Sequence, residues 1–302
     1  MDSTFLGALA ALGAATAWSF SGILSHSTAK NLGGFGFNRL RLLLAGSVLL
    51  VLTSVLGQWQ YIGWQPFTLL IISGFIGIFI GDSALFSTLA RLGPRRTQLI
   101  YSTHAPITVI LGFLFLNQSI TGADLFGCIL VFLGIWVAIF FGKPKTELHN
   151  FEQITGKLWV GMLIGLIAAL CQAVGVIFSS PVMQSGAVNP LLATTLRLVT
   201  AALCAQALGL IPLKIIAFKA PVTKKNILIA ALSGLLGLGL GMGLYMQGLR
   251  YAPAGLVAVL SAITPVLMLP MLWVFMQKVP APQSWIGALL VVGGTVMIIM
   301  PQ

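Results

Sequence analysis

Ten long apolar stretches occupy almost the whole chain and are separated by short connections. Each holds roughly 20 residues, the length that a helix needs to cross the hydrocarbon core of a bilayer. Only 7% of the 302 residues are charged, whereas a soluble domain carries about 25%, so an aqueous fold is excluded. The sequence predicts an all-α polytopic membrane protein. Its ten transmembrane helices are expected at residues 5–25, 36–56, 67–89, 97–116, 123–141, 158–178, 189–211, 227–249, 254–275 and 284–300.

The two halves of the chain repeat one pattern of five helices. In each third span a serine is followed by spaced glycines, at residues 73–81 and again at 233–241. Because each half has an odd number of spans, the second half must enter the membrane from the opposite side. We therefore expect two inverted five-helix repeats, residues 1–142 and 158–302, joined by a loop at 143–157 and packed around a central cavity. Later matches between the halves are Arg91 with Arg250, Pro106 with Pro265, Gln118 with Gln277, and Gly127 and Gly134 with Gly287 and Gly294.

The net charge of +11 is distributed unevenly between the two membrane faces. Fourteen basic residues lie in or beside the loops after spans 1, 3, 5, 7 and 9, whereas the opposite face, which includes both termini, carries only Arg250. Basic loops stay in the cytoplasm, so both termini are expected outside it, in a multi-pass protein of the cell (inner) membrane. The basic residues form no stripe interleaved with aromatics, and nucleic acid is not an expected partner.

Several short motifs, which recur in the same order in the two halves, resemble the paired EamA domains of the drug/metabolite transporter superfamily. They are Ala17-Trp18-Ser19, Arg41 with Arg197, the third-span glycines that lead into residues 90–94, Ala105-Pro106 with Thr264-Pro265, and the fifth-span glycines. The resemblance covers essentially the whole chain. It implies two interleaved five-helix units that carry small metabolites such as amino acids, sugars, nucleotide derivatives or drugs. Two features depart from the family: Gln118 and Gln277 replace a common acidic residue, and the basic loops oppose the common cytoplasmic placement of the termini.

Asp82 is the only acidic residue expected well inside a span. A centrally placed aspartate costs roughly 2.5–3.5 kcal/mol on insertion scales, so it needs a partner or water. One interpretation makes Asp82 a proton or cation site that is coupled to the solute, or a counter-charge for an amine. The other interpretation makes it the structural ion-pair partner of Arg41 or Arg197.

Arg41 and Arg197 occupy matching places in the second and seventh spans. A guanidinium can bind the carboxylate or phosphate of a solute through two parallel hydrogen bonds. Alternatively, each arginine extends to the interface or ties helix ends together. Arg41 stands beside Arg39, which favours the structural role, whereas Arg197 stands alone in an apolar segment.

His104 precedes Pro106 in the fourth span, and Pro265 takes the matching place in the ninth. A proline deprives the carbonyl four residues earlier of its donor and favours a kink, which a membrane tolerates where neighbours or water satisfy the freed group. A histidine at such a break can relay protons. A hydrogen bond from His104 to a neighbouring helix is the favoured alternative.

Trp18, Gln172 and Tyr245 complete the candidate binding residues. Trp18 stands at mid-span, away from the interfacial belts where tryptophan is common, so it is a candidate wall of the cavity. Gln172 stands near the equivalent place in the sixth span, and a buried amide there needs partners. Packing is the simpler role for each of the three.

Glycines recur at helical spacing in the third span of each half. Such glycines let helix backbones approach closely, and their cost in a helix interior also points to bending. Close packing is the favoured role, and a gating hinge is the alternative. The residues concerned are Gly77, Gly81, Gly237 and Gly241, together with Pro106 and Pro265.

These features favour a secondary transporter that moves a small organic metabolite, such as an amino acid, sugar, nucleoside or drug-like solute, by alternating access. The sequence has no GxxxxGK(S/T) motif for ATP, so a proton, another ion or solute exchange would drive it, with Asp82 as the coupling group. A lipid flippase is the alternative, since it shares the architecture. The partners would be the bilayer and the solute, and a monomer would suffice.

An intramembrane enzyme is the least favoured class. The chain has three histidines, of which only His104 is mid-span, and it has no HExxH motif or paired carboxylates. The three cysteines stand singly inside apolar spans. No catalytic residue, metal site or cofactor is therefore expected.

Overall fold

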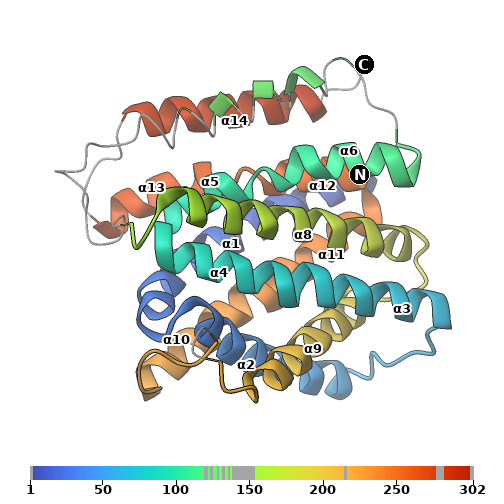
Figure 1. Ribbon diagram of the computed structural model, residues 1–302. Coiled ribbons are helices and arrows are strands. Elements are labelled where there is room, and N and C mark those ends of the chain that lie inside the picture. The colour runs from blue at the N-terminus through green and yellow to red at the C-terminus, as the bar shows by residue number, and fades with distance from the viewer. Residues whose placement is uncertain are drawn as a thin grey trace.

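The computed structural model describes residues 3–118, 122, 125–127, 129–130, 133–134, 137, 154–213, 216–276 and 282–299. These residues are almost wholly helical and include no strand (Figure 1). Eight helices within them are long and apolar enough to cross a membrane. The chain is thus an integral multi-pass membrane protein. Much of the expected fifth span, 123–141, and most of the loop at 143–157 fall outside the described residues.

The first half contains four of these eight spans. The first two are α1 (Ser3–Leu32) and α2 (Gly34–Val55). The third consists of α3 (Trp64–Ser73), η1 (Gly74–Ile80) and α4 (Gly81–Leu92). The fourth consists of α5 (Pro94–Tyr101) and α6 (His104–Leu116). Gly93 ends α4 with a positive φ of 79°, and Pro94 then starts α5, where its missing N–H costs nothing.

The second half repeats this order of elements. It begins with α8 (Leu158–Gln184) and α9 (Pro190–Gly209), then α10 (Lys224–Gly234), η4 (Leu235–Gly241) and α11 (Met242–Tyr251). It continues with α12 (Ala254–Ser261), α13 (Thr264–Met276) and α14 (Pro282–Ile299), which lies at the expected tenth span. The side chain of Asn189 caps α9 by accepting from the N–H of Leu191.

Each third span contains a seven-residue π-helical segment that the sequence did not predict, η1 in one half and η4 in the other. Such segments interrupt α-helices rarely and often at functional sites. The segment η1 contacts α8 and α9, and η4 contacts α1 and α2, so each segment packs against the other half of the chain. The two third spans, α3 to α4 and α10 to α11, run in opposite directions in Figure 1.

The fourth span and its counterpart both break just before a proline. Ser102 and Thr103 separate α5 from α6, and the carbonyl of Ser102 accepts instead from the N–H of Ala105 at 3.1 Å. In the second half, the hydroxyl of Thr264 donates to the carbonyl of Ser261 at 2.6 Å. Neighbouring groups therefore satisfy the carbonyls that Pro106 and Pro265 deprive of a donor.

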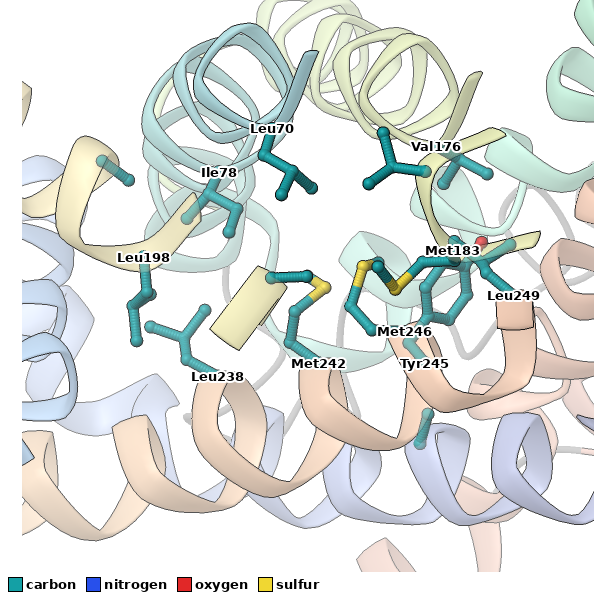
Figure 2. Packing of buried hydrophobic residues seen from close by; sticks show 14 of the residues in the cluster. Leu70, Ile78, Val176, Met183, Leu198, Leu238, Met242, Tyr245, Met246 and Leu249 are labelled. Carbon is teal, nitrogen blue, oxygen red and sulfur yellow. The ribbon is translucent and has the colours of Figure 1, made fainter. Parts of the chain in front are cut away.

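The buried core lies between the third spans and helices α8 and α9. Figure 2 shows side chains such as Ile78, Leu198 and Leu238 meeting there. The outward faces of the helices carry large apolar residues, among them Phe115 at 68% exposure. Exposed apolar surface of this kind suits lipid rather than water.

Candidate functional site

A buried cavity of about 40 Å³ lies where helices of the two halves meet. A volume of this size holds a few water molecules. Its walls come from α1, α2, α4, α5, η4 and α11. The lining residues are Trp18, Ser21, Gly22, Arg41, Asp82, Leu85, Phe86, Leu89, Thr97, Gln98, Tyr101, Gly237, Leu238 and Met242. Three of the candidate binding residues selected from the sequence therefore share this cavity, namely Trp18, Arg41 and Asp82, and the selected glycine Gly237 lines it as well.

Asp82 forms an ion pair with Arg41 in the cavity wall. The Nη1 of Arg41 lies 3.3 Å from the Oδ2 of Asp82, and the two residues are only 3% and 5% exposed. The expected structural pairing of Asp82 is thus with Arg41. Asp82 lies ten residues before the end of α4 at Leu92, about 15 Å along the helix axis, or half the thickness of a ~30 Å hydrocarbon core. The pair therefore lies well inside the third span and away from both of its ends.

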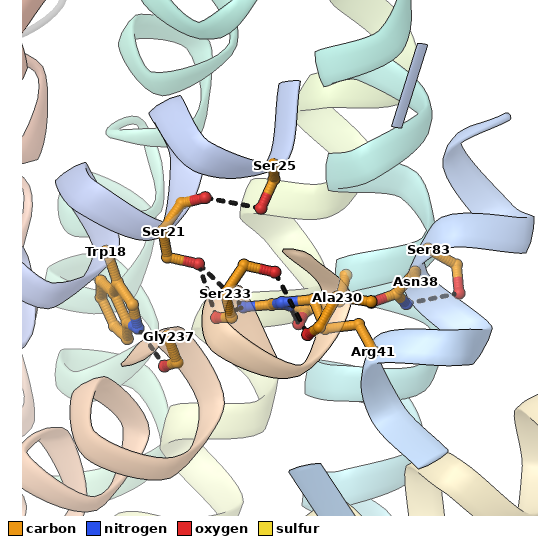
Figure 3. Close-up of polar contacts among 10 residues, drawn as sticks. Trp18, Ser21, Ser25, Asn38, Arg41, Ser83, Ala230, Ser233 and Gly237 are labelled. Carbon is orange, nitrogen blue, oxygen red and sulfur yellow. Dashed lines mark hydrogen bonds and ion pairs between the residues drawn. The ribbon is translucent and has the colours of Figure 1, made fainter. Parts of the chain in front are cut away.

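The guanidinium of Arg41 has further partners, one of which comes from the other half of the chain. Its Nη2 donates to the hydroxyl of Ser21 at 3.3 Å and to the carbonyl of Ser233, in the second half, at 3.4 Å (Figure 3). Its carbon Cζ lies 4.5 Å from the centre of the Phe86 ring, a cation–π geometry. These contacts help to offset the burial of the ion pair, while the Nε of Arg41 has no partner among the described residues.

Trp18 forms another wall of the cavity. Its Nε1 donates to the carbonyl of Gly237 at 2.9 Å (Figure 3). Its indole packs against the ring of Tyr245, with 5.2 Å between ring centres. Gly241 allows this approach, because a Cβ there would lie 2.7 Å from the indole. The tryptophan thus presents a fixed aromatic surface toward the ion pair.

Arg197 lies outside the cavity, behind Met242. It is 0% exposed, and its Nη1 lies 3.2 Å from the sulfur of Met242 and 3.3 Å from that of Met246. Its Nε and Nη2 have no hydrogen-bond partner among the described residues. Figure 2 shows the two methionines side by side next to Tyr245, which is also fully buried.

Gln172 and His104 are buried away from the cavity. Gln172 is 0% exposed, and neither atom of its amide has a hydrogen-bond partner within the described part of the chain. His104 begins α6, is 1% exposed and packs against the ring of Tyr101 at 5.1 Å between ring centres. His104 is therefore next to a lining residue but does not itself line the cavity, and a proton relay there stays a prediction.

The glycines selected from the sequence lie against the two arginines and their surroundings. A Cβ on Gly77 would lie 3.3 Å from the Nη2 of Arg197, and one on Gly81 would lie 3.2 Å from the Cβ of Cys171. A Cβ on Gly237 would overlap the Nη2 of Arg41. Close packing, the favoured role of these glycines, is thus the geometry observed.

Several residues of the site were not selected from the sequence. The carbonyl of Ser233 is a backbone acceptor, which side-chain patterns cannot reveal. Phe86 and Tyr101 looked like ordinary apolar residues of their spans. Met242 follows Gly241 as Asp82 follows Gly81, so it replaces Asp82 in the second half, and that mismatch is the available sequence signal.

Comparisons with known proteins place the chain in a family. The model of the EamA-like transporter family matches residues 5–140 and 159–300, and the chain belongs to this family. A solved crystal structure of a protein aligns with 97% of this chain and 96% of its own, at a TM-score of 0.72 and 20% identity. At this level of identity the similarity concerns the fold alone.

A curated relative described as an uncharacterized transporter, from Archaeoglobus fulgidus, is 29% identical over 164 residues. The match covers 52% of this chain and 57% of that relative. The chain thus spans little more than half the length of the relative that it matches.

Proposed function

We propose that this protein is a secondary transporter, which moves a small organic metabolite across the membrane by alternating access. The observation that carries the proposal is the buried Arg41–Asp82 pair, well inside the membrane-spanning helices and in a cavity lined by both halves of the chain. Charged residues inside a membrane mark solute and ion pathways. A Trp18 wall beside the pair adds an apolar surface for the body of an organic solute.

A cavity of about 40 Å³ is too small for a metabolite, so the transport cycle must open it. The two halves, residues 1–142 and 158–302, would rock against each other, and η1 and η4 lie along their contact. Asp82 is the proposed coupling group. Protonation of its carboxylate would remove the charge that holds Arg41 and would leave that guanidinium free to bind the solute.

The proposed orientation follows the charges of the loops. The basic loops would face the cytoplasm and both termini the outside of the cell (inner) membrane. In this orientation, the end of α4 is cytoplasmic. Protons would then reach Asp82 from either side in turn, as the cavity opens alternately.

The test is solute uptake into proteoliposomes under an imposed pH gradient, with Asp82→Asn as the variant. The expected result is a folded protein that has lost pH-driven uptake. Glu152→Gln is the matched control, because it removes a carboxylate that the sequence places in a loop. Unchanged pH-dependent uptake by Asp82→Asn would exclude Asp82 as the coupling group.

A further inference from the structure

The two arginines of the repeat occupy matching places in the two halves, and their partners differ in charge. The Nη1 of Arg41 lies 3.3 Å from the Oδ2 of Asp82. The Nη1 of Arg197 lies 3.2 Å from the sulfur of Met242. In the third span of the second half, Met242 occupies the place that Asp82 has in the first half. Met242 lies nine residues before the end of α11 at Tyr251, about 14 Å along the helix. The thioether therefore stands where a carboxylate stands in the first half.

The glycines around the two arginines also correspond. A Cβ on Gly74 would lie 2.5 Å from the carbonyl oxygen of Arg197, and one on Gly234 would lie 3.1 Å from that of Arg41. In both cases a glycine-rich third span of one half admits the arginine of the other half. The two sites therefore share this close backbone packing, while only Arg41 has a counter-charge among the described residues.

Arg197 has no carboxylate partner in the part of the chain that the structure describes. The only acidic residue there is Asp82, and its ion pair is with Arg41. A thioether is a weak acceptor, and Nε and Nη2 of Arg197 have no acceptor among the described residues. A fully buried guanidinium in this condition is costly unless an anion pairs with it.

Gln172 is a second buried group without a partner. Its amide nitrogen and oxygen both lack hydrogen-bond partners among the described residues, and the residue is fully buried. It follows Cys171, whose carbonyl oxygen lies 3.6 Å from the position that a Cβ on Gly77 would take, and that position is also 3.3 Å from the Nη2 of Arg197. The backbone next to Gln172 thus packs on the same glycine as the guanidinium.

We infer that Arg197 binds the carboxylate or phosphate of the transported solute, in the position that corresponds to the Asp82 carboxylate on Arg41. This inference rests on the proposed transport function and narrows its substrate to an organic anion. Met242 lines the cavity and touches Arg197. The side chain of Met242 is unbranched and flexible. When it moves aside, the guanidinium of Arg197 becomes accessible from the cavity. Trp18 then packs against the apolar body of the solute.

The test measures the thermal unfolding midpoint of the purified full-length protein with acetate, benzoate or phenyl phosphate. Benzamide is the neutral match of benzoate, and sodium chloride at equal ionic strength is the control for salt. We expect a saturable rise of the midpoint with benzoate or phenyl phosphate and none with benzamide. The comparison of these two anions tells whether a carboxylate or a phosphate fits.

Substitutions connect that shift to Arg197. Met242→Asp supplies the missing carboxylate from within the chain, so it should raise the midpoint without ligand and weaken anion binding at least tenfold. Arg197→Met should abolish the anion-specific shift. Arg39→Met should keep it, since Arg39 binds Gln206 away from the cavity.

The inference is overturned by three results: equal shifts with chloride and benzoate, no anion-specific shift in the wild-type protein, or a shift that survives in both Arg197→Met and Met242→Asp. These measurements need no transport. A protein that binds benzoate through Arg197 but moves no solute in vesicles would uphold the site and refute the carrier. A protein that transports only amines or neutral solutes would uphold the carrier and refute the anion site.

Discussion

The Arg41–Asp82 pair should behave as one energetic unit, and a double-mutant cycle can measure this. Breaking a buried pair by removing one partner costs about 3–5 kcal/mol. For Asp82→Asn we expect about 3 kcal/mol, the lower end of that range, because Arg41 keeps its bonds to Ser21 and Ser233. For Arg41→Met we expect about 5 kcal/mol, because Asp82 has no other donor among the described residues.

The double variant Arg41→Met with Asp82→Asn should lie within about 1 kcal/mol of the wild-type protein, since it leaves no buried charge. The assay is reversible unfolding in mixed micelles with increasing SDS, which gives the free energy of unfolding for all four proteins. The two single effects sum to about 8 kcal/mol, so the expected coupling energy is about 7–9 kcal/mol. Single effects that add to within about 0.5 kcal/mol in the double variant would refute the pairing.

Three further predictions address packing, the cavity wall and orientation. Gly74→Ala should lower the free energy of unfolding in SDS by about 1–3 kcal/mol, because the added Cβ would lie 2.5 Å from a backbone oxygen. The control is Gly243→Ala, which should be neutral or stabilising because nothing lies within 4 Å of its added Cβ. Equal effects of the two substitutions would contradict the close packing at Gly74. Trp18→Phe should cost about 0.6 kcal/mol, the typical value of a hydrogen bond in a membrane, and Trp18→Ala about 3–5 kcal/mol in the same assay. If the carboxy terminus lies outside the cytoplasm, alkaline phosphatase fused to it should be active and green fluorescent protein fused to it should be dark. The reverse pattern would place that terminus in the cytoplasm.

The fold and the members of the ion pair could be predicted because both follow from the cost of polar groups in a bilayer. Long apolar stretches define the spans, and a charge inside one is rare enough to select Asp82, Arg41 and Arg197. Which arginine pairs with Asp82 could not be predicted. It depends on the rotation and approach of helices from different parts of the chain.

The π-helical segments were also beyond sequence patterns. The glycines of residues 74–81 and 234–241 indicated close packing and bending, but the hydrogen-bond register of a helix depends on what packs against it. The relation between Met242 and Arg197 was hidden for a similar reason. A methionine in an apolar span carries no signal until the structure places its sulfur on a guanidinium.

Counterflow tests the central claim most directly. Proteoliposomes are loaded with the unlabelled anion that most raises the unfolding midpoint and are then diluted into a trace of the same labelled compound. A carrier that alternates access predicts a transient accumulation of label inside, above its outside concentration. Simple equilibration without this overshoot would indicate a pore, and no entry of label above that of empty vesicles would contradict transport.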